Sequence, residues 1–377
     1  MFDPSEEWNI SFAGCGFRSI YYVGALSCFL ERVPQLVHGA SKFGGASSGC
    51  LVAAALAVGV PIEQLCISIL NLAKGARKHT LGVFHPTFRM LQTVRRSLLE
   101  MLPEDAHLRA TGKLCVSLTR LADGGNVLVS TFDTREELIQ VLMCSCFFPV
   151  YCGFIPPSYH GVHYVDGALS NNMPLFEHRN TITMAPFSGE SDICPKEGTF
   201  NFFEVSYGNV SIQVNTGNVH RVCSSFLPPT LEKLAEICQN GYMDALRFIK
   251  ERDLLSVKYS PRSVALHGKE LANAEKARLR AKLRRNARNR RQKDQISPNR
   301  TVTGILPASV GKVLCEACRY NPDTGSCWSP LTDLLPTKRI IYMLTLPLLL
   351  SILLGQRLWN EQTIDACSRS LQTHMDH

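Results

Sequence analysis

Hydrophobic and polar positions near the N-terminus alternate as they do in a β-strand. Residues 8–12 alternate large apolar with polar side chains, a glycine-rich loop follows, and a helical pattern runs from about residue 22 to residue 32. A second unit has the same order, because a short segment before Ser47 leads into the Ala/Val/Leu-rich run 50–58. These strand–loop–helix units predict an α/β fold with a mostly parallel central sheet.

Further along the chain, the segments 113–118, 126–132 and 181–185 are also expected to be strands. A shorter strand, from residue 162, ends in Asp166-Gly167. An aspartate at a strand end, beside a flexible glycine, can point into a cleft. The alternative is an ordinary Asp-Gly turn, which is common.

The loop after the first strand is a candidate anion-binding site. Gly14, Cys15, Gly16 and Phe17 lie between strand and helix, where backbone N–H groups lack helical partners and the helix dipole adds partial positive charge. Such a loop can hold a nucleotide phosphate or a catalytic oxyanion. A dinucleotide-binding loop has a third glycine where this chain has Ser19, so the oxyanion is favoured.

The segment Gly45-Ala46-Ser47-Ser48-Gly49 has the spacing of a nucleophile elbow. An elbow is a sharp strand-to-helix turn that presents the serine Oγ at a helix N-terminus, and its glycines allow close backbone approach. The alternative is an ordinary Gly/Ser turn before a core helix. The elbow interpretation makes Ser47 the candidate nucleophile.

The glycine-rich loop, Ser47 and Asp166, in this order and spacing, resemble the patatin-like phospholipases. Additional motifs extend the resemblance to the vertebrate branch that contains adipose triglyceride lipase and adiponutrin, over about residues 5–255. The resemblance implies a patatin-like three-layer fold. These motifs are His85-Pro86-Thr87-Phe88, Leu102-Pro103-Glu104-Asp105-Ala106-His107, Ser117-Leu118-Thr119-Arg120, Pro149-Val150-Tyr151-Cys152-Gly153-Phe154-Ile155-Pro156-Pro157, Phe187-Ser188-Gly189-Glu190-Ser191-Asp192-Ile193-Cys194-Pro195 and Gly241-Tyr242-Met243-Asp244-Ala245-Leu246-Arg247-Phe248.

The resemblance implies a Ser-Asp dyad, in which Ser47 is the nucleophile and Asp166 alone is the base. A serine hydroxyl is a poor nucleophile unless a neighbouring base accepts its proton. A triad would need a histidine, and His160, His163 and His178 lie near Asp166 in the sequence. We expect these to be surface or supporting imidazoles. The backbone N–H groups of the loop at residues 14–17 are expected to bind the oxyanion.

Two residues depart from the family pattern. Ser19 and Ala168 stand where patatin-like loops usually have glycine, and either residue is strained if its φ is positive. Both departures bear on activity more than on fold. Arg18, in the same loop as Ser19, could attract anionic headgroups, but we expect it to be solvated.

The fifteen cysteines are expected to be reduced and mostly buried, because no secretory signal is recognisable at the N-terminus. Cys315 and Cys318, with Cys327, have partial zinc-site spacing, and a fourth ligand would have to come from Cys367 or His374. We favour no metal and no cofactor.

Charge and apolar content change after about residue 255. We expect a catalytic domain at 1–255, a basic linker at 256–300 and a C-terminal region at 301–377. Residues 276–293 contain ten Lys or Arg and no Asp or Glu, whereas the whole chain carries a net charge of only +8. This run is expected to be a solvated helix or linker, with an anionic-phospholipid patch as the alternative. No aromatic residues are interleaved in it, so nucleic-acid binding is not expected.

The uncharged stretch 340–354 is too short to span a bilayer, which takes about 20 residues, and Pro347 lies within it. We expect a monotopic anchor in a monolayer, with a buried helix as the alternative, and the resemblance to the adipose branch implies that this monolayer covers a lipid droplet. The protein is therefore expected in the cytoplasm, at the lipid-droplet surface or another membrane.

The expected function is a serine acylglycerol lipase, a triacylglycerol hydrolase of triglyceride homeostasis. The alternatives are an acylglycerol transacylase or phospholipase A2 that uses the same dyad. A third is a weakly active droplet protein that sequesters an α/β-hydrolase-like lipase co-activator. The expected partners are acylglycerol substrate, the droplet monolayer and that co-activator.

Overall fold

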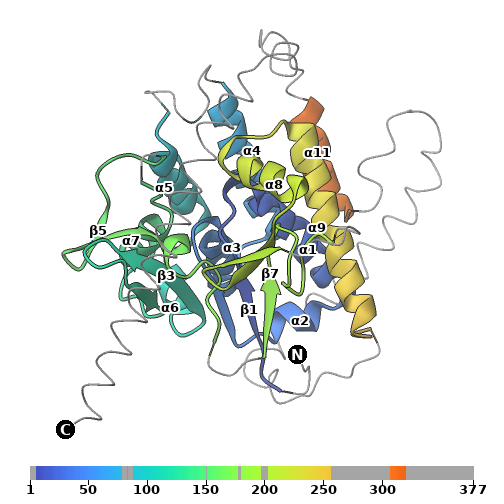
Figure 1. Cartoon of the computed structure of the whole chain (residues 1–377), viewed down its shortest axis with the longest axis horizontal. Coiled ribbons are helices and arrows are strands. Elements are labelled where there is room, and N and C mark those ends of the chain that lie inside the picture. The colour runs from blue at the N-terminus through green and yellow to red at the C-terminus, as the bar shows by residue number, and fades with distance from the viewer. Residues whose placement is uncertain are drawn as a thin grey trace. The chain divides into compact units, whose positions relative to one another are not determined.

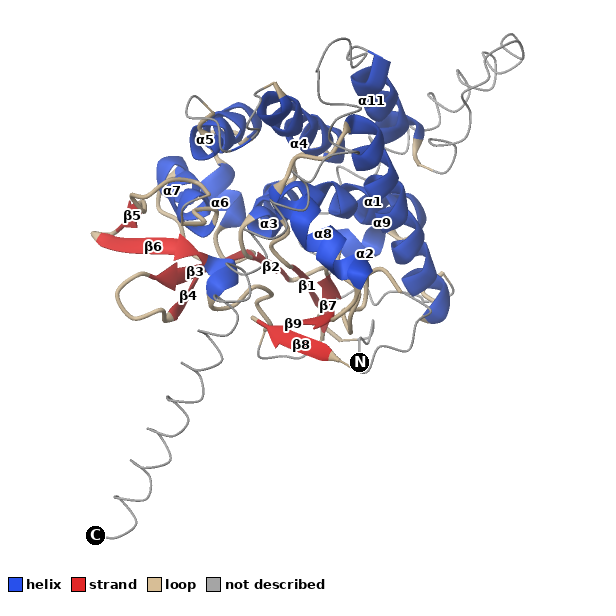
Figure 2. Ribbon diagram, turned by 45° about the horizontal axis from the view of Figure 1, so that its top comes forward, coloured by secondary structure: helices blue, strands red, loops and turns tan. Residues whose placement is uncertain are grey.

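The computed structural model describes residues 6–78, 83, 88–149, 151–176, 180–196, 203–255 and 306–319. Contacts divide the chain into the units Met1–Tyr320 and Asn321–His377, and every described residue belongs to the first unit. Figures 1 and 2 show a mixed α/β arrangement, with helices packed around a central sheet.

The central sheet has seven strands in the order β5-β6-β3-β2-β1-β7, with β4 also paired to β3. Its central pairs, β3 with β2, β2 with β1 and β1 with β7, are parallel. The pairs β3–β4, β3–β6 and β5–β6 are antiparallel. The strands are β1 (Asn9–Phe12), β2 (Lys42–Gly45), β3 (Leu114–Arg120), β4 (Asn126–Val129), β5 (Ser158–Tyr159), β6 (Val162–Asp166) and β7 (Thr181–Met184).

The strand β1 is central because both of its edges are paired. All four of its residues are buried, and they lie in register with Lys42–Gly45 on one side and Thr181–Met184 on the other. Parallel strands covered on both faces are expected in the interior of an α/β fold. The expected α/β class and mostly parallel centre are confirmed, and the antiparallel edge is an addition to the prediction.

Helices α3 and α7 pack directly on the sheet, and α1 packs along α9. Tyr21 of α1 donates a 2.6 Å hydrogen bond to the Asp244 carboxylate of α9. The helices are α1 (Ile20–Arg32), α2 (Pro34–His38), α3 (Ser48–Val58), α4 (Ile62–Arg77), α5 (Met90–Met101), α6 (Ala106–Ala110), α7 (Arg135–Ser145), α8 (Thr216–Phe226) and α9 (Leu231–Glu251). Two 3₁₀ turns, η1 (Gly16–Ser19) and η3 (Gly167–Leu169), and a hairpin, β8 (Glu204–Tyr207) with β9 (Val210–Gln213), complete this part.

One further helix, α11 (Ala308–Arg319), packs on α4 and α9 with Val310 and Leu314 buried. Its residues fall in the segment that the sequence assigned to the C-terminal region. The basic run 276–293 and the apolar stretch 340–354 lie outside the described residues. None of the described helices is long and apolar enough to cross a membrane.

Candidate active site

The strand β3 determines how close Ser47 and Asp166 come. Gly45, the last residue of β2, lies beside Val116, and Asp166, the last residue of β6, lies beside Leu118. The strand β4 pairs with residues 116–119 of β3 and so occupies one edge of β3. Because β2 and β6 pair with residues that β4 also pairs with, both must lie on the opposite edge, where β6 follows β2. Ser47, two residues beyond Gly45, therefore meets Asp166 at the carboxyl ends of the parallel strands.

Ser47 has the backbone conformation of a strained elbow. Its φ is 52° and its ψ is −134°, and it is the N-cap of α3. A non-glycine residue in this region costs about 1–3 kcal/mol, and such strain is concentrated at functional sites. A Cβ on Gly49 would collide with the carbonyl oxygen of Phe12, and a Cβ on Gly45 would lie 2.6 Å from the carbonyl carbon of Gly49. The predicted elbow glycines are thus required by packing.

Asp166 is 2% exposed, and burial raises the pKa of its carboxyl group from 3.8 to about 7. The Ala168 N–H donates to the Asp166 carboxylate at 2.9 Å, and both this bond and the nearby Ser47 side chain favour the ionised form and oppose the shift. A carboxylate with a pKa near 7 can exist in both protonation states at neutral pH. This is the condition for a group that accepts and returns a proton.

A hydrogen-bonded relay through Ser145 fixes the elbow against the sheet. The Ser47 N–H donates to Ser145 Oγ at 3.0 Å, and Ser145 Oγ donates to the Ser117 carbonyl at 2.8 Å. A Cβ on Gly167 would collide with the same carbonyl of Ser117, so the glycine after Asp166 is also required. Ser145 was missed by sequence reasoning, and its only signal is a serine at the end of an otherwise apolar helix face.

The glycine-rich loop presents two kinds of N–H group. Gly14 donates to Asn172 Oδ1 at 2.7 Å and Cys15 donates to Ser48 Oγ at 3.0 Å, so these two N–H groups are occupied. Gly16 and Phe17 begin η1, where no preceding helical carbonyl is available, and no acceptor for their N–H groups is seen within the described part of the chain. These two N–H groups are the better candidates for binding an oxyanion.

Several contacts hold this loop in place. The Tyr22 hydroxyl donates to the Ala13 carbonyl at 2.6 Å, and Gly16, with a φ of 54°, lies against the Ser225 carbonyl of α8. Asn172 follows the Asp166-Gly167 turn in the sequence. Its role as an acceptor for Gly14 depends on a contact between residues 158 positions apart, which no local pattern indicates.

The two described histidines near Asp166 in the sequence make other contacts. His160 Nε2 lies 3.1 Å from Glu137 Oε1, and His163 Nδ1 lies 3.1 Å from the Pro156 carbonyl; both imidazoles are exposed. His178 lies outside the described residues. The hydrogen bonds that affect the Asp166 pKa come from Ser47 and Ala168.

Neither departure from the family pattern strains the backbone. Ser19 has a φ of −55°, and Ala168 is not among the described non-glycine residues with positive φ. The expectation that Arg18 is solvated is wrong. Arg18 is 5% exposed, its Nη1 donates to Ser224 Oγ at 3.0 Å, and its buried Nε has no hydrogen-bond partner. Burial lowers the pKa of its guanidinium to about 10.

The described cysteines are free thiols, and most are buried. Burial raises the pKa of Cys15, in the glycine-rich loop, to about 11, so this thiol is protonated and a weak nucleophile at neutral pH. Within the described ranges, no cluster of three or more His, Cys, Asp or Glu side chains could hold a metal ion. Cys315 and Cys318 lie on α11, whereas Cys327 lies outside these ranges.

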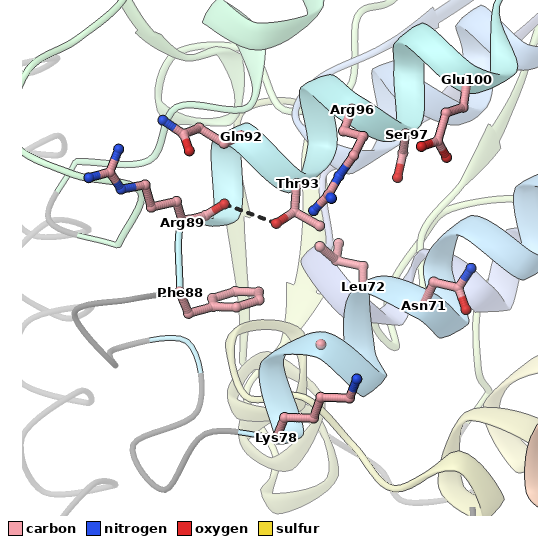
Figure 3. A pocket seen from close by; sticks show the side chains of 11 residues that line it. Asn71, Leu72, Lys78, Phe88, Arg89, Gln92, Thr93, Arg96, Ser97 and Glu100 are labelled. Carbon is pink, nitrogen blue, oxygen red and sulfur yellow. Dashed lines mark hydrogen bonds between the residues drawn. The ribbon is translucent and has the colours of Figure 1, made fainter. Parts of the chain in front are cut away.

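A cavity of about 650 Å³ lies between α4 and α5 (Figure 3). Leu72 and Phe88 provide apolar walls, and Lys78 and Arg96 provide positive charge. Neither Ser47 nor Asp166 lines this cavity.

Comparison with known proteins identifies related sequences. The sequence model of the family described as patatin-like phospholipase matches residues 10–177. Patatin-like phospholipase domain-containing protein 2 from Mus musculus is 42% identical over 353 residues, which cover 92% of this chain and 71% of that protein. The 1-acylglycerol-3-phosphate O-acyltransferase PNPLA3 from Homo sapiens is 44% identical over 254 residues, 67% of this chain and 53% of that protein.

One solved structure also aligns with the chain. The crystal structure of VipD from Legionella pneumophila matches with a TM-score of 0.39 and 16% sequence identity, over 66% of this chain and 68% of that chain. The sequence relatives, at more than 40% identity, are much closer.

Proposed function

The chain belongs to the patatin-like phospholipase family, and from this premise we propose that it is a serine acylglycerol hydrolase with Ser47 as nucleophile and Asp166 as base. One observation carries the proposal. A buried carboxyl group with a pKa raised to about 7 lies near enough to a serine side chain at a helix N-terminus for that serine to lower its pKa. The comparisons support the lipase class, and the human acyltransferase among the relatives also indicates acyl transfer.

In the first half of the proposed reaction, Asp166 accepts the proton of Ser47 Oγ as this oxygen attacks an ester carbonyl. Negative charge then develops on the carbonyl oxygen. The N–H groups of Gly16 and Phe17, together with the positive end of α3, are placed to stabilise it. Protonated Asp166 returns its proton to the departing alcohol, and an acyl ester remains on Ser47.

In the second half, Asp166 accepts a proton from an incoming hydroxyl group as the oxygen of that group attacks the acyl ester. The bond between the acyl group and Ser47 Oγ then breaks, and Asp166 returns the proton to Ser47 Oγ. Water as acceptor gives a free fatty acid, and an acylglycerol hydroxyl as acceptor gives acyl transfer. Both outcomes use the same two residues. The human relative that is 44% identical, a 1-acylglycerol-3-phosphate O-acyltransferase, supports the second outcome.

The strain that favoured a weakly active binding protein as the alternative is not found in the described residues. That alternative depended on strain at Ser19 and Ala168, and neither residue has a positive φ. The glycines that the site needs, Gly49 and Gly167 among them, are present where a Cβ would not fit.

We further propose that the enzyme meets its substrate at a phospholipid monolayer over neutral lipid, as at a lipid droplet, with residues 340–354 as an anchor. Fifteen uncharged residues suit insertion into one leaflet, because they are too few to cross two. Binding of an α/β-hydrolase-like co-activator belongs to the same proposal and is tested with it.

The test compares the wild type with Ser47→Ala and Asp166→Asn on emulsified triolein and on phosphatidylcholine, with and without co-activator. Fatty-acid release should fall at least a hundredfold in both variants, and a fluorophosphonate probe should label only proteins that retain Ser47. A labelled acceptor, 1-acylglycerol-3-phosphate, separates acyl transfer from hydrolysis in the same samples. Equal release from all three proteins would end the hydrolase proposal.

A further inference from the structure

The loop between α7 and β5 exposes two adjacent large hydrophobic side chains. Phe154 is 86% exposed and Ile155 is 85% exposed, the highest values among the exposed large hydrophobic residues that the structure describes. We call these two residues the apolar tip. Single exposed hydrophobic residues are common, but two adjacent ones with almost no intramolecular contact indicate a surface that binds something else.

The apolar tip is held rigidly at its roots. On one side the Cys152 N–H donates to the Phe148 carbonyl at 2.9 Å. On the other side the carbonyls of Pro156 and Pro157 accept hydrogen bonds, the latter from the Tyr164 N–H at 3.2 Å. Two consecutive prolines also restrict the backbone directly after the tip. The exposed side chains are therefore preorganised, and little conformational entropy is lost when they bind.

The roots of this loop are joined to the proposed catalytic residues. The Asp166 N–H donates to the Phe147 carbonyl at 2.8 Å, and Ser145, two residues earlier, accepts the Ser47 N–H. On the α8 side, the Tyr151 hydroxyl donates to the Phe226 carbonyl at 2.7 Å. Whatever the tip binds is therefore brought next to the site.

The chemistry of the loop favours lipid over a protein surface. From residue 138 to residue 165 the chain contains no Asp, Glu, Lys or Arg. The two prolines have no N–H, and the carbonyls of Pro156, Pro157 and Ser158 already accept hydrogen bonds. The backbone directly after the tip therefore has few groups that would lose water if the two side chains entered hydrocarbon, where an unsatisfied backbone group costs several kcal/mol. A protein interface usually offers a polar rim that can form hydrogen bonds, and this tip has few such groups.

We propose that Phe154 and Ile155 insert into the phospholipid layer that covers the substrate and thereby place Ser47 and Asp166 at the lipid surface. The contact is separate from the expected anchor at 340–354. It depends on the proposed function only for the identity of the substrate, since insertion itself needs no catalysis.

The test uses the full chain in a Ser47→Ala background, so that no turnover affects the result. A Phe154→Trp variant is mixed with phosphatidylcholine vesicles whose acyl chains are brominated, and its emission is compared with that of the unsubstituted background, which contains three tryptophans. Bromine quenches only indoles within the acyl region. We expect extra quenching in the variant. No quenching beyond that of the background would overturn the proposal.

A second measurement uses triolein emulsions coated with phosphatidylcholine. The double variant Phe154→Ser/Ile155→Ser should bind these emulsions at least about tenfold more weakly, because two large apolar side chains no longer leave water on binding. The matched control, Leu108→Ser/Leu121→Ser, removes two other exposed leucines, 70% and 51% exposed, and should bind like the background. If both double variants bound the emulsions equally weakly, the loss would reflect general surface hydrophobicity. That result would contradict insertion by this loop.

Without the Ser47→Ala change, the double serine variant should hydrolyse a water-soluble short-chain ester at the wild-type rate. This result separates the two proposals. If the proposed activity is wrong, soluble-ester hydrolysis is missing from the wild type as well, whereas bromine quenching is still observed. If insertion is wrong, quenching is missing and soluble-ester hydrolysis remains.

Discussion

The backbone N–H of Gly14 donates a 2.7 Å hydrogen bond to the side-chain oxygen of Asn172. The first residue lies in the glycine-rich loop after β1, and the second follows the turn η3 after Asp166. The bond therefore connects the loop expected to bind the oxyanion with the segment that carries the base. The space around Gly14 is closed in the same way, since a Cβ there would lie 2.8 Å from Ser47 Cβ and 2.9 Å from Asn172 Oδ1.

Replacement of Asn172 by alanine should slow catalysis without unfolding the protein. The Gly14 N–H loses its acceptor, so the loop is no longer held in register, and small misplacements at a reacting centre cost roughly tenfold to a hundredfold. We expect a lower kcat on a soluble ester, an unchanged KM and slower labelling of Ser47 by fluorophosphonate. Asn171→Ala, the matched control, should stay near the wild-type rate. Equal rates for both variants would contradict a positioning role for Asn172.

The rate should depend on the ionisation of Asp166. Only the carboxylate accepts a proton, and burial raises its pKa to about 7. The value of kcat/KM on a soluble ester should therefore rise about tenfold per pH unit up to about pH 7 and level off above it. A rate that is constant from pH 5 to pH 8 would show that the base has an ordinary carboxyl pKa, or that Asp166 is not the base.

The stability of the protein should show the same ionisation with a defined sign. The folded-state pKa of Asp166 lies above its ordinary value of 3.8, so burial favours the protonated form. This contribution to the free energy of unfolding is fully present below about pH 4 and is lost as the pH rises to about 7. Asp166→Asn cannot ionise, so it should gain stability relative to wild type over this range, by up to roughly 4 kcal/mol.

Urea unfolding of both proteins at several pH values measures this difference. The wild-type and Asp166→Asn curves should lie closest together at acid pH and separate towards neutrality. Asn171→Ala, which removes no ionisable group, is the control and should show no such separation. A constant difference between wild type and Asp166→Asn at all pH values would contradict the raised pKa.

The positive φ of Ser47 predicts that the residue needed for activity lowers the stability of the protein. Ser47→Ala and Ser47→Gly both remove the hydroxyl group, but only glycine adopts a φ of 52° without strain. Both variants should be inactive, and the glycine variant should be more stable than the alanine variant by roughly 1 kcal/mol. Chemical denaturation measures the difference. A more stable alanine variant would mean that the elbow stores no strain at this residue.

Arg18 should lower the free energy of unfolding of the protein. Its guanidinium is buried and donates to the neutral Ser224 hydroxyl, and burial, with a smaller effect of the nearby Arg221, lowers its pKa to about 10, which means that the charged form is disfavoured. Arg18→Met keeps a side chain of similar length and removes the charge, so the free energy of unfolding should increase by roughly 1–3 kcal/mol. Arg32→Met, at a half-exposed arginine, should change it little. A loss of stability in Arg18→Met would indicate a bound anion or partner that the charge serves.

Much of the fold and the chemical identity of the site could be predicted from the sequence. The elbow around Ser47, the loop at Gly14–Phe17 and the turn after Asp166 are local, because each depends on where glycine must stand between a strand and a helix. Strand periodicity placed β1, β3 and β7 to within two residues at each end, whereas the strand expected at 126–132 ends at Val129. Beyond Val129 the chain no longer pairs with β3. The backbone N–H and carbonyl of Phe132 form hydrogen bonds with the Thr111 hydroxyl instead of with a neighbouring strand.

Tertiary structure alone decided the properties that depend on distant residues. The pKa of Asp166 is set by burial, the partner of Gly14 lies 158 residues away, and Ser145 reaches the elbow from a different helix. Arg18 has the composition of a surface residue and is buried, because α8 packs over the loop that carries it. Side-chain type and spacing determine local backbone geometry, but solvent exclusion and long-range hydrogen bonds exist only once the sheet and its helices have assembled.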